Sequence, residues 1–146
     1  MRYLILCLSI SLSGSLFAPA ALADAEADIK YRQNTFKIVG GHMGSMATIL
    51  RDGIKREDFA YHARSIAAVA SLVPTVFPAG SGDGKTEALP EIWTEPEEFQ
   101  AALDKFLTAA ANMGEVADSD DMRAIGGAMK ALGGSCKGCH DNYKAD

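Results

Sequence analysis

The residues best suited to chemistry lie near the C-terminus, where Lys137 and Gly138 separate Cys136 from Cys139 and His140 follows at once. This C-x-x-C-H pattern is typical of covalent haem attachment. Two thiols three residues apart on a helix can both reach the vinyl groups on one porphyrin edge, and the adjacent imidazole can then bind the iron. The pattern predicts one haem c attached through Cys136 and Cys139, with His140 as its metal ligand.

Two other kinds of site contain Cys-x-x-Cys. A thioredoxin-like redox pair lies near the start of a helix in a βαβ context, whereas this pair is close to the C-terminus of a chain with helical patterns only. A structural zinc site needs a second pair of ligands. Apart from His140, only His42 and His62 remain, and we expect both at the surface or at a helix edge. Haem is therefore the favoured interpretation.

The first 23 residues have the features of a secretory signal peptide. Arg2 provides a positive start, an apolar stretch follows, and Ala21-Leu22-Ala23 forms a small-x-small cleavage site. Cleavage after Ala25 is a second possibility. The apolar stretch is too short for a membrane anchor, which needs about 20 strongly apolar residues. We expect residues 24–146 to form the mature domain, and export together with a covalent haem indicates a bacterial periplasm.

Composition is typical of a single globular domain. The chain has 146 residues, of which 48% are apolar and 23% are charged, and its net charge is −5. An acidic protein is not expected to bind nucleic acid or an anionic membrane; it would suit a basic partner or none, and a redox partner is one possibility. Only two cysteines remain once Cys7 is removed with the signal peptide, so a disulfide framework is not expected.

Apolar spacing predicts four helices, at about 25–50, 55–77, 94–114 and 118–144, with a Gly- and Pro-rich crossover loop at 78–94. Pro74 is expected to kink or end the second helix early. Thr94-Glu95-Pro96-Glu97 resembles a capping box at the start of the third helix. The predicted fold is an all-α, antiparallel four-helix bundle.

The heptad pattern places the haem inside this bundle, near one end. The first helix has an apolar face on which Arg32 is the single charged residue: Ile29, Arg32, Phe36, Val39, Met43, Met46 and Leu50. The fourth helix has a similar face that includes both cysteines: Met122, Ile125, Met129, Leu132, Cys136, Cys139 and Tyr143. Gly133 and Gly134 would give room for the ring. Gly40, Gly41 and Gly44 suggest a close approach by a helix or a ligand.

Three segments resemble a known family, the cytochromes c′, or class II c-type cytochromes. These segments are Lys30-Tyr31-Arg32-Gln33, Pro90-Glu91-Ile92-Trp93 and the stretch from Cys136 to Lys144. The resemblance implies five-coordinate, high-spin iron with an open distal face that admits NO and CO. It places Phe36 over the iron, where a side chain without a lone pair caps the metal sterically.

The resemblance also implies which other side chains contact the haem. Arg32 would pair with a haem propionate, since a buried guanidinium needs an anionic partner. Trp93 would lie at the haem edge or cover the mouth of the bundle, although plain core packing is an equal alternative. Lys144, four residues after His140, would lie in the proximal pocket and tune the imidazole. The full expected set is Arg32, Gln33, Phe36, Trp93, Tyr143 and Lys144.

Three functions follow from these features. The first is a periplasmic protein that binds NO or CO, for sequestration or detoxification. The second is a low-spin electron carrier in which Met43 or Met46 is the sixth ligand. The third, an enzyme acting on NO or peroxide, is disfavoured because no general acid or base is placed near Phe36. The family resemblance further implies a homodimer formed through the first two helices.

Overall fold

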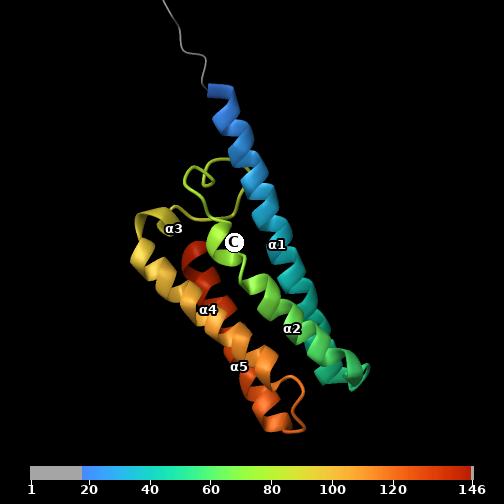
Figure 1. The fold of residues 1–146 in the computed structure, drawn as a ribbon. Helices are drawn as coiled ribbons and strands as arrows, with labels where there is room; N and C mark the ends of the chain where they lie inside the picture. The colour runs from blue at the N-terminus through green and yellow to red at the C-terminus, as the bar shows by residue number, and fades with distance from the viewer. Residues whose placement is uncertain (1–17, 146) are drawn as a thin grey trace, which may run out of the picture.

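The computed structural model describes the backbone of residues 18–145 and the side chains of residues 24–145. Its helices are α1 (Ala18–Asp52), α2 (Phe59–Ala70), α3 (Glu91–Thr94), α4 (Pro96–Val116) and α5 (Met122–Tyr143), as Figure 1 shows. This part of the chain contains no strand and no helix long and apolar enough to cross a membrane. Most of the expected signal peptide, residues 1–17, lies outside the described residues.

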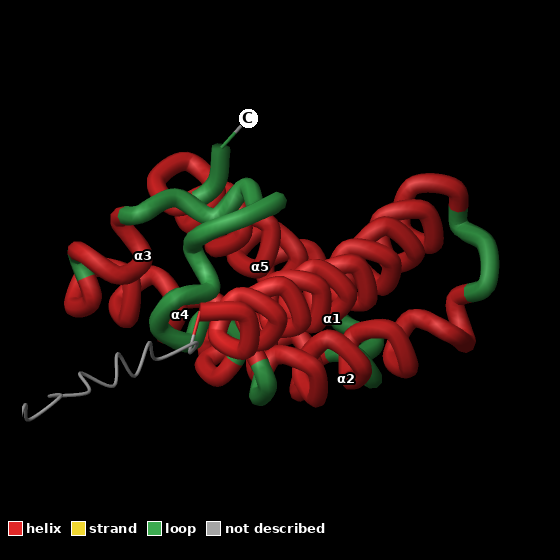
Figure 2. Tube along the Cα trace, turned by 90° about the horizontal axis from the view of Figure 1, so that it is seen from above, coloured by secondary structure: helices red, strands yellow, loops and turns green. Residues whose placement is uncertain are grey.

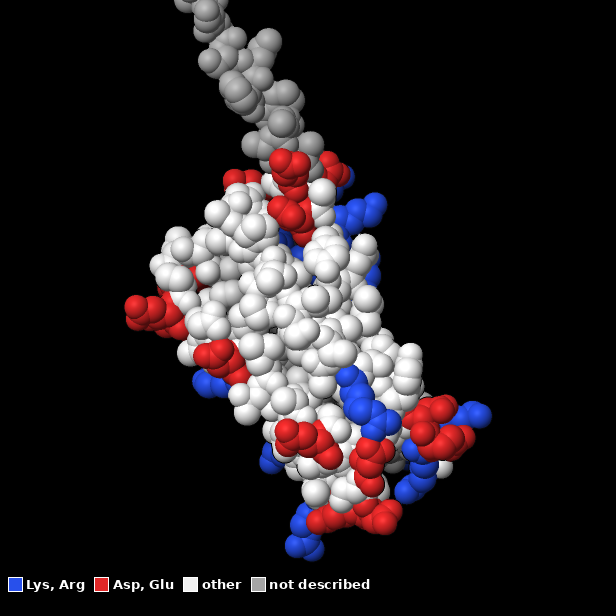
Figure 3. All heavy atoms as spheres, viewed as in Figure 1, with Lys and Arg blue, Asp and Glu red and all other residues white. Residues whose placement is uncertain are grey.

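The four long helices form an antiparallel bundle. α1 packs on α2, α2 on α4, and α4 on α5, and successive long helices run in opposite directions (Figures 1 and 2). The expected all-α, four-helix architecture is confirmed. On the face seen in Figure 3, charged side chains gather towards the two ends of the bundle and leave a largely uncharged surface between them.

The core has two parts. The main cluster runs through the bundle and includes Val39, Met46, Ile66, Phe106, Met113, Ile125 and Leu132. A smaller cluster at one end contains Ile92, Phe99 and Tyr143, with Cys139 and Trp93 packed against it. The apolar face predicted for the first helix does point inward. Met122 is the exception on the last helix, because its side chain is 49% exposed.

Local chemistry explains where the helices begin and end. α2 is shorter than expected because it stops at Ala70, and Pro74 lies in a separate 3-10 turn, Val73–Thr75. The predicted capping box before α4 is wrong, since Glu95 is the N-cap and its side chain makes no capping hydrogen bond. Asp121 does cap α5, because its carboxylate accepts hydrogen bonds from the backbone N–H groups of Arg123 and Ala124.

The crossover loop between α2 and α3 is held by a tryptophan. The indole Nε1 of Trp93 donates hydrogen bonds to the carbonyls of Phe77 and Pro78, both at 3.2 Å. Gly82 lies against the same ring, where an added Cβ would be 2.8 Å from Trp93 Cζ3. In contrast, a Cβ at Gly40 would meet no atom within 4 Å, and the same holds at Gly41 and Gly44. The close approach expected at those three glycines therefore does not occur within this chain.

We expect Gly82→Ala to destabilise the protein by about 1–3 kcal/mol, because the pinned indole cannot move away from the new methyl group. Gly40→Ala is the matched control. It fills open space on a helix and should stabilise the fold by up to about 1 kcal/mol through helix propensity. Urea unfolding followed by circular dichroism measures both free energies, and equal effects of the two changes would contradict the packing described.

Two histidines join α1 to α2. His42 Nδ1 lies 2.8 Å from His62 Nδ1, and both rings are partly buried, with Tyr61 next to them. Their partial burial fits the expected helix-edge position, and the contact between them is an addition that the sequence did not predict. Burial, and secondly the neighbouring His62, lower the pKa of His42. At this distance one nitrogen must donate and the other accept, so the pair cannot hold two protons here.

We predict that this contact makes stability depend on pH. The pKa of His42 is lower in the folded chain than its value of about 6.5 in the unfolded chain, so below that pH the unfolded state binds more protons. Stability should be complete above about pH 6.5 and should fall as the pH drops below it. His42→Gln should remove this part of the dependence. Urea unfolding of both proteins between pH 5 and 8 tests it, and parallel profiles would refute it.

Candidate functional site

The two cysteines lie on the inner side of α5. Cys136 packs against the main core cluster and Cys139 against the smaller one, and both side chains are partly buried and free of any disulfide. Burial is the main cause that raises the pKa of each thiol, and Cys136 raises that of Cys139 further. Two neutral thiols, one helical turn apart and facing the interior, fit a group attached at two points on one edge.

His140 lies on the exposed side of α5, directly after the inward-facing Cys139. Its ring makes no hydrogen bond with any residue in the described part of the chain, so no existing partner competes with a metal for its nitrogens. The neighbouring Lys137 and Asp141 pair with each other across one turn and leave the imidazole free. The structure thus brings Cys136, Cys139 and His140 together, although it does not by itself assign the ligand.

The register between α1 and α5 decides which residue of α1 faces His140. A Cβ at Gly133 would lie 3.6 Å from Met43 Cε, so these two positions are opposite each other. The helices are antiparallel, and seven residues towards the start of α1 correspond to seven towards the end of α5. Phe36 lies seven residues before Met43, about 10 Å along α1 towards the end of the bundle that contains His140, given a rise of 1.5 Å per residue.

A line of aromatic rings joins Phe36 to the end of α5. Phe36 and Phe77 have ring centroids 6.0 Å apart, Phe77 and Phe99 5.0 Å, and Phe99 and Tyr143 5.1 Å. The last two pairs are edge to face, the favourable geometry for aromatic rings. Phe36 is partly buried and Tyr143 is buried. The row of rings therefore lies across the end of the bundle that contains the cysteines.

Arg32 is buried, with 3% of its surface exposed. Its guanidinium donates to four neutral oxygens of the crossover loop and its approach: Val76 O (3.2 Å), Ser81 Oγ (2.7 Å), Ser81 O (2.8 Å) and Thr86 Oγ1 (2.9 Å). It also lies over the rings of Phe77 and Trp93. Burial lowers its pKa, and the charge of Asp28 acts in the opposite direction. Arg32 forms no direct ion pair with the described residues, so its hydrogen-bond partners are neutral, although the opposite charge of Asp28 acts on it.

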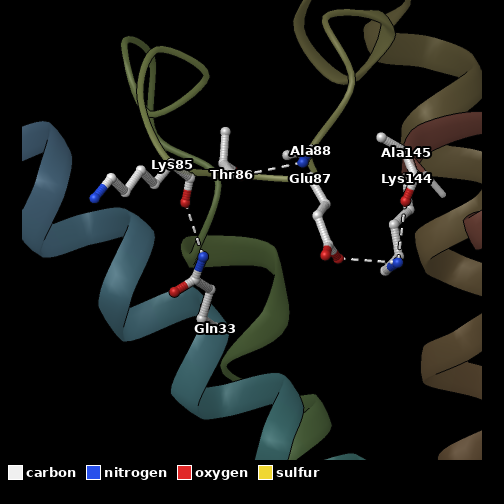
Figure 4. Close-up of polar contacts among 7 residues, drawn as sticks. All are labelled: Gln33, Lys85, Thr86, Glu87, Ala88, Lys144 and Ala145. Atoms are coloured by element: carbon white, nitrogen blue, oxygen red, sulfur yellow. Dashed lines mark hydrogen bonds and ion pairs between the residues drawn. The ribbon is translucent and has the colours of Figure 1, made fainter.

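The same loop contacts the C-terminal end (Figure 4). On one side, Gln33 Nε2 donates to the carbonyl of Lys85 at 3.0 Å. On the other, Lys144 Nζ lies 2.9 Å from the carboxylate of Glu87, and the Ala145 N–H donates to the Glu87 carbonyl at 2.8 Å. The loop is therefore fixed between α1 and the residues that follow the haem-attachment motif.

Lys144 departs from its expected placement. It is the C-cap of α5, and although its N–H still donates to the His140 carbonyl at 3.3 Å, its backbone is extended. Its ammonium is directed to Glu87 in the loop. Trp93 covers the same end of the bundle and packs against the smaller core cluster. Sequence reasoning missed the loop partners Ser81, Thr86 and Glu87, because nothing in a Gly- and Ser-rich segment indicates which hydroxyl becomes buried.

We predict that Arg32→Met lowers the free energy of unfolding by about 2–4 kcal/mol. It keeps the apolar stem but leaves buried loop carbonyls and hydroxyls without their donor. Gln33→Met is the matched control, because Gln33 is exposed and makes one loop contact, and its loss should be below about 1 kcal/mol. Urea unfolding of the haem-bound proteins measures both. Similar losses would show that the guanidinium does not hold the loop.

Comparisons with known proteins agree with this site. The family model for cytochrome c′ matches residues 27–144. Cytochrome c′ of Pararhodospirillum photometricum is 36% identical over 124 residues, which is 84% of this chain and 99% of that protein. Among solved structures, cytochrome c prime from Shewanella frigidimarina superposes with a TM-score of 0.80 at 35% identity, and the match covers 84% of this chain and 97% of the other.

The range matched by the family model includes the segments that hold Arg32, Trp93 and the cysteine pair. Cytochrome c-554 of Cereibacter sphaeroides is a further relative, 31% identical over 93% of this chain and 95% of that protein. The fold, the two inward-facing thiols and the sequence match have one common explanation: the chain belongs to the cytochrome c′ family, whose cofactor is a covalently attached haem c.

Proposed function

We propose that this protein binds small gaseous ligands, NO and CO, at a five-coordinate haem iron. In this proposal Cys136 and Cys139 carry the haem and His140 is its protein ligand. The observation that supports the proposal is the contact of Met43 with the Gly133 position, from which we infer that Phe36, rather than Met43, lies towards the end of the bundle that contains His140. A phenyl ring has no lone pair, so the position opposite the imidazole stays open to a ligand that can displace the ring.

Structures of related proteins support this ligand class. Cytochrome c prime from Alcaligenes xylosoxidans has been solved as a ferrous variant with bound NO, at 26% identity and a TM-score of 0.76 to this chain. Another variant of that protein was solved with carbon monoxide bound. Both matches cover 84% of this chain. The proposal extends those ligands to this chain as a binding function, with no catalytic turnover.

The charge of Arg32 fits a haem in this position. Its guanidinium is buried and makes no direct ion pair with the described residues, and a haem propionate would supply one. Because four hydrogen bonds already hold the guanidinium in the loop, it would act as a fixed positive charge. Trp93 and Tyr143 are the other expected contacts that lie at this end of the bundle.

Electron transfer through a low-spin haem is the second candidate, with Met43 as sixth ligand. The thioether of Met43 does point towards α5, near Gly133. That position is one turn before Cys136 and two turns before His140, which favours packing beside the haem over iron ligation. Met46 is fully buried in the main core cluster and is directed elsewhere.

We also propose that the mature domain is periplasmic and forms a homodimer through α1 and α2. The signal-peptide features of residues 1–23 support the location. Exposed side chains on the two helices support the interface: Tyr31 and Ile38 on α1 and Tyr61 on α2. A related cytochrome c′ with 29% identity and a TM-score of 0.77 shows ligand-controlled dimer dissociation.

Optical spectra of the haem-bound protein test the proposal. We expect broad high-spin bands in the ferric and ferrous states, and a shift of the Soret band on addition of CO. Phe36→Met should place a thioether opposite His140, which would give a low-spin spectrum and a weakened CO response. Met43→Leu is the matched control on the same face and should leave the spectra unchanged.

Phe36→Ala should raise CO affinity about tenfold or more, equivalent to about 1.4 kcal/mol, because the ligand no longer displaces a ring. CO titration of the ferrous protein measures this. Low-spin spectra in the parent protein that turn high-spin in Met43→Leu would instead establish the electron-carrier alternative.

A further inference from the structure

The His42 and His62 pair lies apart from the proposed haem site. Met43 points from α1 towards α5, whereas the adjacent His42 points towards α2 and meets His62. The two rings have centroids 5.1 Å apart and an interplanar angle of 56°. Neither imidazole contacts the cysteines, Phe36 or the crossover loop. The pair is therefore a separate cluster of nitrogen ligands, contributed by two different helices.

We propose that His42 and His62 form a second metal site, which binds one divalent transition-metal ion and prefers Cu²⁺. Imidazole nitrogens are common protein ligands for copper, nickel and zinc, and Cu²⁺ binds most strongly among the divalent ions of this series. The proposal does not depend on the gas-binding function, since the haem uses His140 and leaves both of these histidines free.

The two Nδ1 atoms are close enough to bind one ion without a separation of the helices. Two imidazole nitrogens each about 2.0 Å from one ion would be separated by about 2.8 Å at adjacent corners of a square and by about 3.3 Å at corners of a tetrahedron. The observed Nδ1 to Nδ1 distance is 2.8 Å. Square-planar or tetragonal coordination is typical of Cu²⁺ and Ni²⁺, whereas zinc sites are tetrahedral. The 2.8 Å contact is a hydrogen bond in the free protein and the rings rotate when a metal binds, so the preference for Cu²⁺ rests on the order of metal affinities.

The surroundings leave room for the ion and for water. A surface groove of about 480 Å³ lies beside His62, lined also by Gly41, Gly44, Asp58 and Lys55. The glycines leave the α1 side of the groove open, because a Cβ at either would meet nothing within 4 Å. Asp58 lies four residues before His62 and faces the same groove. Since the described residues contain no cluster of three His, Cys, Asp or Glu side chains, water completes the coordination.

Metal binding needs a simple rearrangement of protons. In the free protein one Nδ1–H donates to the other Nδ1, as the 2.8 Å contact requires. Both Nδ1 lone pairs face the ion in the bound form, so the donor's proton moves to its own Nε2 through solvent. The rings then rotate until both nitrogens point at the ion. No proton is released when both imidazoles are neutral, and protons compete with the metal when the pH is low.

Titration of the ferric, haem-bound protein with CuCl₂ at pH 7.5, followed by calorimetry, tests the site. We expect one equivalent of Cu²⁺ to bind, more tightly than Zn²⁺. Electron paramagnetic resonance of the bound copper should show hyperfine splitting from two nitrogens. This measurement needs no variant, and a copper spectrum without nitrogen splitting would overturn the proposal.

Two variants then identify the ligands. His42→Gln and His62→Gln should each weaken Cu²⁺ binding by at least about tenfold, because each removes one of two protein ligands. Ser65→Gln is the matched control, since it places the same amide one turn further along α2 and keeps both imidazoles. Circular dichroism and the Soret band report whether each variant remains folded. Copper binding that is equal in the parent and in both histidine variants would overturn the proposal.

Discussion

The buried guanidinium of Arg32 is the constraint on which the haem end of this bundle depends. A cation taken out of water must be fully hydrogen-bonded, and the crossover loop supplies four acceptors from segments 44 to 54 residues away in sequence. This requirement fixes a loop whose Gly- and Pro-rich sequence would otherwise permit many conformations. Once the loop is fixed, Phe77 and Trp93 are held over the end of α1.

The fixed loop also connects the two faces of the haem site. It contacts α1 through Gln33, one turn before Phe36, and it contacts the C-terminal residues through Glu87 and Lys144. One stretch of loop backbone therefore contacts both α1 and the residues that follow His140. A displacement of the end of α5 would be resisted by the Glu87 ion pair and by two backbone hydrogen bonds, to Tyr143 and from Ala145.

Away from the haem end, the contact between α1 and α2 includes a polar pair. There, α1 and α2 meet through the His42 and His62 pair, a polar contact between helices that are otherwise joined by apolar packing. A histidine pair of this kind responds to protons and to metal ions because imidazole titrates near neutral pH and its neutral nitrogens bind metals. Its protonation therefore acts on the contact between the two helices. The long α1 thus carries the proposed gas-binding face towards α5 and the histidine face towards α2, on two different faces of the same helix.

The sequence alone determined the helical fold, the attachment motif and the inward faces of α1 and α5, because helical periodicity and C-x-x-C-H spacing are local properties. It also singled out Arg32 as a charge on an apolar face. Only the tertiary structure decided its partners, the place of the Lys144 ammonium and the contact between His42 and His62. These depend on which distant segments meet and on the register of α1 against α5. No local pattern encodes that register, since it results from packing the whole core at once.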